Sequence, residues 1–161
     1  MRHSGGVSKL KVFNSPGAVI GLAWGLHGPF REYLARMPDG TMTALGDAEL
    51  LVNDEAYFPI DRHSSTADSL HFTGTLQFTG HNGMLAVTIQ NPWLKRTEGT
   101  VTLTIVDPFD RSARMDLVAA EFQDDNTAKT RLTEAGTDVF MGNYPENIAF
   151  DPLRILWAGK D

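Results

Sequence analysis

The chain has 161 residues, of which 42% are hydrophobic and 21% charged, a balance typical of one globular domain and unlike that of a disordered chain. Its formal net charge is -6 and no stripe of Lys and Arg occurs, which argues against nucleic acid and against an anionic membrane surface as partners. The absence of cysteine excludes disulfides, Cys-ligated zinc and iron–sulfur clusters.

The N-terminal residues 1–17 are predicted to form a leader with a short edge element, and residues 18–161 a single domain. The leader has no apolar stretch of signal-peptide length, and no segment approaches the ~20 apolar residues of a membrane span. The sequence as it stands therefore predicts a cytoplasmic protein with no membrane span. A secreted or cell-surface protein whose signal peptide has been removed is the alternative.

Residues 18–24 have the composition of a strand, and a short helix is expected between Pro29 and Pro38. Proline suits the first turn of a helix, and the residue before a proline disfavours helical geometry. The apolar residues of this segment are spaced three or four apart and share one face: Leu26, Phe30, Tyr33, Leu34 and Met37. Because two to three turns are not stable alone, the helix must pack against another element.

The segment 70–90 predicts a β-hairpin. Apolar and polar residues alternate along 70–80, as in a half-buried strand, and Asn82-Gly83 provides the two positive-φ positions of a type I′ turn. This register places Phe78 opposite Val87, on the apolar face. His81 falls on the opposite face, beside the turn.

Residues 100–106 and 115–122 alternate in the same way, with a turn at 107–110 between them. A short helix at 132–140 has Thr133 as candidate N-cap, and a last strand is expected near 153–157. Many short strands separated by turns predict a mainly β fold, an antiparallel β-sandwich or irregular barrel with one or two short helices.

No P-loop, nucleophile elbow, zinc-protease motif or dinucleotide fingerprint occurs, and the five histidines are not spaced as metal-ligand pairs. Two residues stand out, Tyr33 on the helix and His81 beside the hairpin turn. Pattern alone favours a core tyrosine and a solvent-facing histidine.

Several short motifs, taken together and in order over about residues 18–157, resemble the HtaA-type haem-transport domain of actinobacterial haem-uptake proteins. They are Trp24-Gly25-x-x-x-x-Phe30-Arg31-x-Tyr33, Phe72-x-Gly74-x-x-x-Phe78-x-Gly80-His81-x-Gly83-x-Leu85, Asn91-Pro92, Arg131-Leu132-Thr133-x-Ala135-Gly136, Phe140-x-Gly142-x-Tyr144-Pro145 and Ala149-Phe150-Asp151-Pro152.

The resemblance implies a β-rich fold that binds haem, as ferric protoporphyrin IX, through a tyrosine. Tyr33 matches the ligating tyrosine, and His81 matches a histidine that hydrogen-bonds to its phenolate oxygen. Tyrosine is an established ligand of haem iron, and such a hydrogen bond orients and tunes a ligand. Phe30 and Phe58 are expected to wall the ring. Arg31 is expected to face either a propionate or solvent.

The alternation of the hairpin adds a geometric expectation to this site. Because His81 falls opposite Phe78, the helix would have to pack on the His81 face, and the pocket would be a second apolar site, separate from the main core. In a competing arrangement His81 itself is the iron ligand.

Three functions follow from the resemblance. The leading one is a haem-binding protein without enzymatic activity, acting in haem uptake or transfer to a partner protein. The alternative is an intracellular family member that uses the same pocket as an enzyme or small-molecule binder in a biosynthetic pathway, which the missing export signal favours. A scaffold with an empty pocket is the third, and the presence of both Tyr33 and His81 argues against it.

Overall fold

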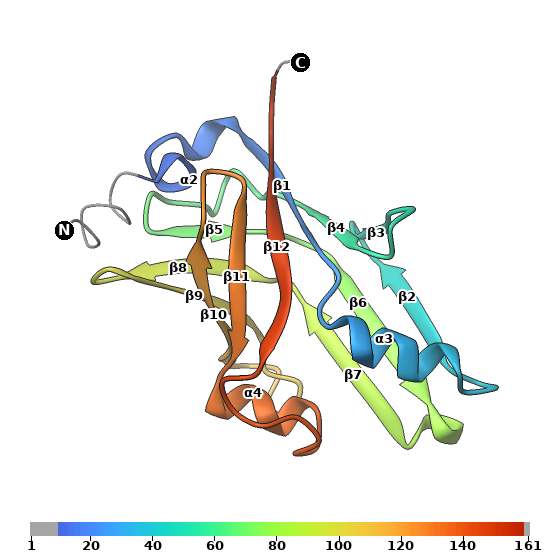
Figure 1. Ribbon diagram of the computed structural model, residues 1–161. Coiled ribbons are helices and arrows are strands. Elements are labelled where there is room, and N and C mark those ends of the chain that lie inside the picture. Colours follow the sequence, from blue (N-terminus) through green and yellow to red (C-terminus); the bar gives the residue numbers. More distant parts are fainter. Residues whose placement is uncertain (1–9, 160–161) are drawn as a thin grey trace.

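The computed structural model describes residues 10–159, which form a mainly β fold of two antiparallel sheets with three short α-helices. The predicted fold class is confirmed. The larger sheet has nine strands in the order β3-β4-β1-β12-β11-β10-β9-β8-β5 and curls strongly, as Figure 1 shows. Its strands are β1 (Val19–Trp24), β3 (Glu49–Leu50), β4 (Ala56–Pro59), β5 (Ser69–His71), β8 (Trp93–Thr97), β9 (Thr100–Val106), β10 (Arg114–Phe122), β11 (Thr127–Leu132) and β12 (Ala149–Trp157).

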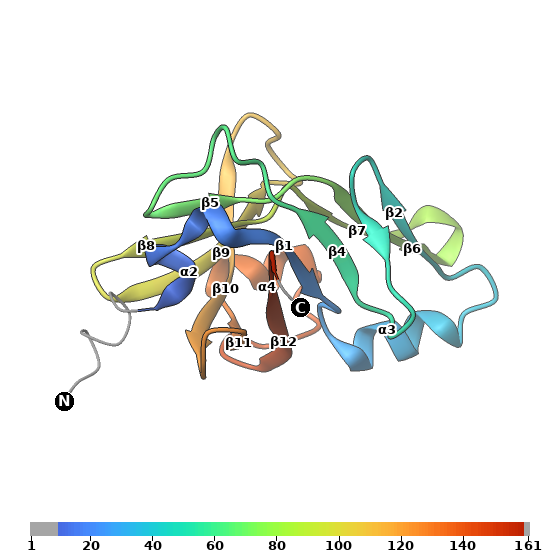
Figure 2. The same cartoon turned by 90° about the horizontal axis from the view of Figure 1, so that it is seen from above.

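The smaller sheet has three strands in the order β2-β6-β7. They are β2 (Thr41–Leu45), β6 (Thr75–Gly80) and β7 (Leu85–Gln90), and the short turn η2 (His81–Gly83) joins the last two. The helix α3 (Gly28–Ala35) lies across one face of this sheet in both views (Figures 1 and 2).

The remaining helical elements are α2 (Lys11–Asn14), η1 (Pro16–Ala18) and α4 (Glu134–Val139), and α4 contacts β10 of the large sheet. Thr133 caps α4 as predicted, because its hydroxyl accepts a hydrogen bond from the Gly136 N–H at 2.9 Å. Of the predicted leader, residues 1–9 lie outside the described residues. Val12 and Phe13 are fully buried in the core, so this part of the segment is packed into the domain. No helix among residues 10–159 is long and apolar enough to cross a membrane.

The hairpin register is confirmed, since Phe78 pairs with Val87 and Leu76 with Ile89. The expectation of one strand over 70–80 is wrong. The chain leaves the large sheet after β5 and enters the small sheet at β6, with Gly74 at φ +119° between them. A Cβ at this position would lie 2.5 Å from the backbone nitrogen of Ala48, so only glycine permits the crossing.

The hairpin returns to the large sheet at Asn91, beside the point where it left. The Asn91 side-chain oxygen accepts the Gly74 N–H at 2.9 Å, and the Asn91 N–H donates to the Gly74 carbonyl at 2.8 Å. The β6–β7 hairpin is therefore an arm that reaches out from the large sheet and is closed at its base by this pair of residues.

A candidate haem site between helix and hairpin

The helix α3 is anchored at its N-terminus by the carboxylate of Asp151 on β12. One carboxylate oxygen accepts the Gly28 N–H at 2.9 Å and the other accepts Arg31 Nη1 at 2.6 Å. The same Arg31 nitrogen donates to the Gly25 carbonyl at 2.6 Å, and the Trp24 indole donates to the Asp151 carbonyl at 2.7 Å. Arg31 therefore serves as an anchor of the helix, with 23% of its side chain exposed to solvent, and a contact between Arg31 and a propionate stays a prediction.

This anchor brings Tyr33 of α3 to the tip of the hairpin. The Tyr33 hydroxyl and His81 Nε2 lie 2.9 Å apart, within hydrogen-bond distance, although 48 residues separate them in the chain. A neutral phenol donates to Nε2, whereas a phenolate accepts a hydrogen bond from Nε2–H. Tyr33 remains 40% exposed, so the helix face predicted to be wholly apolar presents this phenol to solvent.

The face on which the helix packs differs from the expectation. The Phe30 ring lies 5.1 Å from the Phe78 ring, so α3 covers the Phe78 face of the hairpin. His81 reaches this face because its backbone is left-handed, with φ +51°, as are Asn82 and Gly83 after it. The left-handed residue breaks the strand alternation from which the opposite face was predicted.

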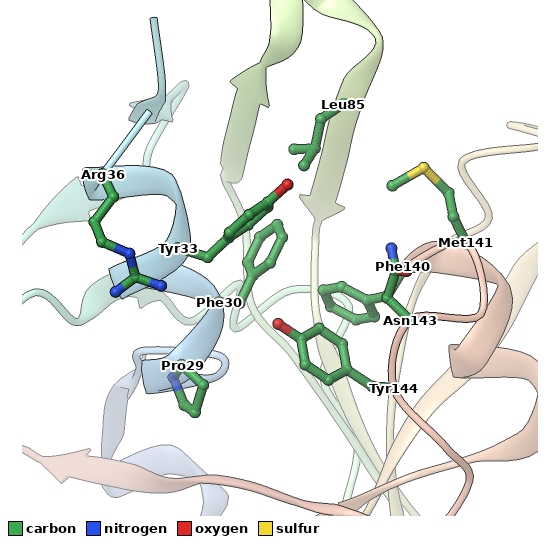
Figure 3. Close-up of a pocket in the computed structure, with 9 residues that line it drawn as sticks. All are labelled: Pro29, Phe30, Tyr33, Arg36, Leu85, Phe140, Met141, Asn143 and Tyr144. Carbon is green, nitrogen blue, oxygen red and sulfur yellow. The ribbon is translucent and has the colours of Figure 1, made fainter. Parts of the chain in front are cut away.

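A hollow of about 430 Å³ opens beside Tyr33, between α3, the start of β7 and the loop after α4 (Figure 3). Its walls are mostly apolar and aromatic. They are formed by Pro29, Phe30, Tyr33, Arg36, Leu85, Phe140, Met141, Asn143 and Tyr144.

Phe30, predicted as a wall residue, is the buried centre of this wall. Its ring contacts Phe78 and also the Phe140 ring at 5.3 Å. The hollow is thus continuous with the main core, in contrast to the predicted separate apolar site. Phe58, the second predicted wall residue, is fully buried in β4 opposite Leu22 and does not line the hollow.

Tyr144, a residue of the Phe140-x-Gly142-x-Tyr144-Pro145 motif, is a further residue of the hollow beyond the predicted site residues. Its ring lies edge-on to His27 at 4.8 Å and to Phe140 at 5.6 Å, and its hydroxyl is directed into the hollow in Figure 3. Burial raises the pKa of the Tyr144 phenol, and the neighbouring Tyr33 raises it further. Tyr144 is therefore held in its protonated form. The packing of the segment after α4 against Phe30 of α3 places it there, and no spacing rule reveals this.

His27 lies behind Tyr144, at the residue before α3. Its ring stacks on Phe150 at 4.3 Å and its Nδ1 is buried with no hydrogen-bond partner among residues 10–159. Burial is the main cause that lowers the pKa of His27. Asp151 opposes this effect, and Arg31 adds to it. A buried histidine whose pKa is lowered thus lies against Tyr144, next to the hollow.

Within residues 10–159 no group of three or more His, Cys, Asp or Glu side chains could hold a bare metal ion. The chemistry that remains at the hollow is one phenol with a histidine partner, set in an aromatic cavity. Such a set suits a flat ligand whose metal needs a single protein ligand.

The sequence pattern of the Htaa (HtaA) family matches residues 20–156. The chain belongs to the Htaa family. Solved structures of Htaa relatives from Corynebacterium glutamicum share the fold. The C-terminal domain of HtaA superposes with a TM-score of 0.68 at 20% identity, covering 86% of this chain and 96% of that one.

Two further Htaa structures from the same organism superpose equally well. The haem-binding protein HtaB has a TM-score of 0.68 at 21% identity and covers 86% of this chain and 91% of its own. The N-terminal domain of HtaA has a TM-score of 0.68 at 20% identity and covers 88% of this chain and 99% of its own. No curated protein matches the chain.

Proposed function

We propose that the protein binds one ferric haem in the hollow beside α3, with the Tyr33 phenolate as axial ligand, and that it passes the haem to a partner protein. The observation that carries this proposal is the Tyr33–His81 pair at 2.9 Å, set at the wall of an aromatic hollow. Ferric haem supplies an iron for which an anionic oxygen is a suitable axial ligand. Membership of the Htaa family and the haem-binding relative HtaB support the same ligand.

His81 holds the ligand oxygen in place. With Nε2 protonated it donates to the phenolate, which orients the Tyr33 oxygen and adjusts its basicity. Phe30 and Phe140 provide apolar surface for the porphyrin. Tyr144, kept protonated, can donate a hydrogen bond to an oxygen of the bound ligand.

Arg36 is a cationic residue of the hollow itself, unlike Arg31. It lines the hollow and has no ion pair among residues 10–159, whereas Arg31 is bound to Asp151. A haem in this site carries two propionates, and guanidinium is a preferred partner of a carboxylate. Arg36 is therefore the cation that we assign to a propionate.

The exposure of Tyr33 supports a role in transfer. The phenol is 40% exposed in the structure, so an acceptor can approach the ligand side of the pocket without unfolding of the domain. The alternative is an enzyme or small-molecule binder that uses the same hollow. The haem titration described next decides between the two, because only the haem proposal requires saturable haem binding.

The test is an absorption titration with haemin of the wild type, Tyr33→Phe and Tyr57→Phe. Tyr57 is the matched control, because its hydroxyl donates to the Ile20 carbonyl at 3.1 Å, outside the hollow. Tyr33→Phe should abolish the phenolate-to-iron charge-transfer band and weaken binding by more than the roughly 10–100-fold typical of a lost supporting contact. Tyr57→Phe should behave as wild type. No saturable spectral change in the wild type at micromolar concentration would sink the proposal.

A further inference from the structure

The tip of the β6–β7 hairpin has an unusual backbone. Three successive residues are left-handed: His81 at φ +51°, Asn82 at φ +57° and Gly83 at φ +87°. A type I′ turn accounts for Asn82 and Gly83. It does not account for His81, which is the first residue of that four-residue turn, outside its two central positions, and whose side chain makes left-handed geometry unfavourable.

A carboxylate from a distant segment binds this backbone. Asp39 Oδ1 accepts the His81 N–H at 3.2 Å, and Asp39 Oδ2 accepts the Asn82 N–H at 2.7 Å. Successive N–H groups of a left-handed stretch converge on one side and form a cavity that favours an anion. The hydrogen bond from Asn82 is the main cause that lowers the pKa of Asp39, so the carboxyl stays ionised.

Two glycines allow Asp39 to reach the tip. A Cβ on Gly40 would lie 2.1 Å from the Leu34 carbonyl oxygen, so only glycine lets the chain fold back tightly on the end of α3. A Cβ on Gly80 would lie 2.5 Å from the Met37 sulfur, so the hairpin and the turn after α3 approach closely. Both close approaches bring the segment that carries Asp39 against the hairpin.

The segment 33–39 therefore holds the hairpin tip at two points. Tyr33 contacts the His81 side chain, and Asp39 binds the backbone of His81 and Asn82. We propose that Asp39 is a positioning residue of the iron-binding pair, which holds His81 in the left-handed conformation from which Nε2 reaches the Tyr33 oxygen. The effect on haem rests on the proposed function, whereas the effect on the Tyr33–His81 contact does not.

The first experiment compares Asp39→Asn with Asp124→Asn. Asp124 is the matched control, because its carboxylate also accepts two backbone N–H groups, those of Asn126 and Thr127, in the turn between β10 and β11. Asp39→Asn should retain the charge-transfer band, shift its position and speed haem dissociation by about 10-fold, within the range for a lost supporting contact. Asp124→Asn should leave the spectrum and the dissociation rate unchanged.

A double-variant cycle separates positioning from general structural support. If Asp39 acts through His81, then Asp39→Asn should have no further effect on haem dissociation in a His81→Ala background. An equal acceleration in both backgrounds would overturn the proposal.

A measurement without haem keeps the two proposals distinguishable. In the ligand-free wild type, a nuclear Overhauser effect should connect the rings of Tyr33 and His81, whose centroids lie 6.1 Å apart. It should weaken in Asp39→Asn and persist in Asp124→Asn. If the wild type binds no haem, the proposed function fails and this comparison still decides the role of Asp39. An unchanged signal in Asp39→Asn would overturn that role.

Discussion

In two hairpins of this protein an aspartate binds backbone N–H groups of the turn, but the position of that aspartate in the chain differs. In the β10–β11 hairpin, Asp124 binds the N–H groups of Asn126 and Thr127 at 2.8 and 2.9 Å, two and three residues further along the chain. In the β6–β7 hairpin, Asp39 binds the N–H groups of His81 and Asn82 across 42 and 43 residues.

This difference in sequence distance distinguishes a turn that only reverses the chain from a turn that also forms part of the candidate site. The carboxylate that binds the N–H groups of the β10–β11 turn belongs to the turn itself, so this contact requires only that its two strands pair. The β6–β7 tip depends on the segment that also carries Tyr33. The backbone conformation of His81 is thereby tied to the position of its partner phenol.

The largest difference in haem affinity between variants of the two hairpin tips is expected for His81→Ala compared with Asn126→Ala. Loss of the imidazole should leave haem bound to Tyr33 but weaken affinity by about 10–100-fold, the usual cost of losing a group that supports a ligand. Asn126→Ala, at the other tip, should leave affinity unchanged. Haem dissociation constants from absorption titration measure both. A loss for His81→Ala greater than that for Tyr33→Phe would mean that His81 is itself the ligand.

A smaller effect, on the pH dependence of stability, is expected from His27, the buried histidine that contacts Tyr144. Its pKa is lowered in the folded state, so the unfolded chain binds a proton more readily below its ordinary pKa of 6.5. The free energy of unfolding should therefore fall as pH decreases from about 6.5 toward the lowered pKa, by at most about 1.4 kcal/mol per pH unit for one proton. His27→Phe should flatten this dependence in chemical denaturation measured from pH 7.5 to 5.

The matched control for His27 is His63→Gln, which replaces an exposed histidine. His71, on the large sheet, also has its pKa lowered by burial, and it contributes a slope of the same sign in every variant. His71 differs in having both ring nitrogens bonded to nearby serines, Ser64 and Ser69. The difference between wild type and His27→Phe isolates His27. Identical pH profiles would contradict the assignment.

The smallest effect is expected for Asp124→Ala. Its carboxylate is fully exposed and supports one surface turn, so the melting temperature should fall by about 2 °C or less. Haem affinity should not change. Thermal unfolding followed by circular dichroism gives the first value and titration the second. A loss of haem affinity in this variant would contradict the proposal that only the β6–β7 tip supports haem binding.

Much of the fold could be predicted from side-chain alternation alone. The register of the β6–β7 hairpin follows from buried Phe78 and Val87 and from the Asn82-Gly83 turn, all within a span of ten residues. The break at Gly74 could not be predicted in this way. It depends on the backbone of Ala48, which approaches from a segment 26 residues earlier.

The site shows the same division between local and distant causes. Tyr33 and His81 were paired through the family motif and not through any spacing in the chain. The face on which they meet was predicted wrongly because left-handed His81 depends on Asp39. The ion pair of Arg31 could not be predicted for an equivalent reason, since its partner Asp151 lies 120 residues away. Long-range hydrogen bonds of this kind leave no periodic signal.

The anchor of α3 by Asp151 also orders events during synthesis. A chain that emerges from the ribosome exposes β1, α3 and both strands of the β6–β7 hairpin long before residue 151 appears. Until then neither the Gly28 N–H nor the Arg31 guanidinium has its carboxylate, and β1 lacks its neighbour β12. Contacts of such wide sequence separation form late, because the intervening chain must first be closed into a loop. The anchor of α3 is therefore completed only after translation of β12, and a nascent chain lacks the finished form of the proposed haem site.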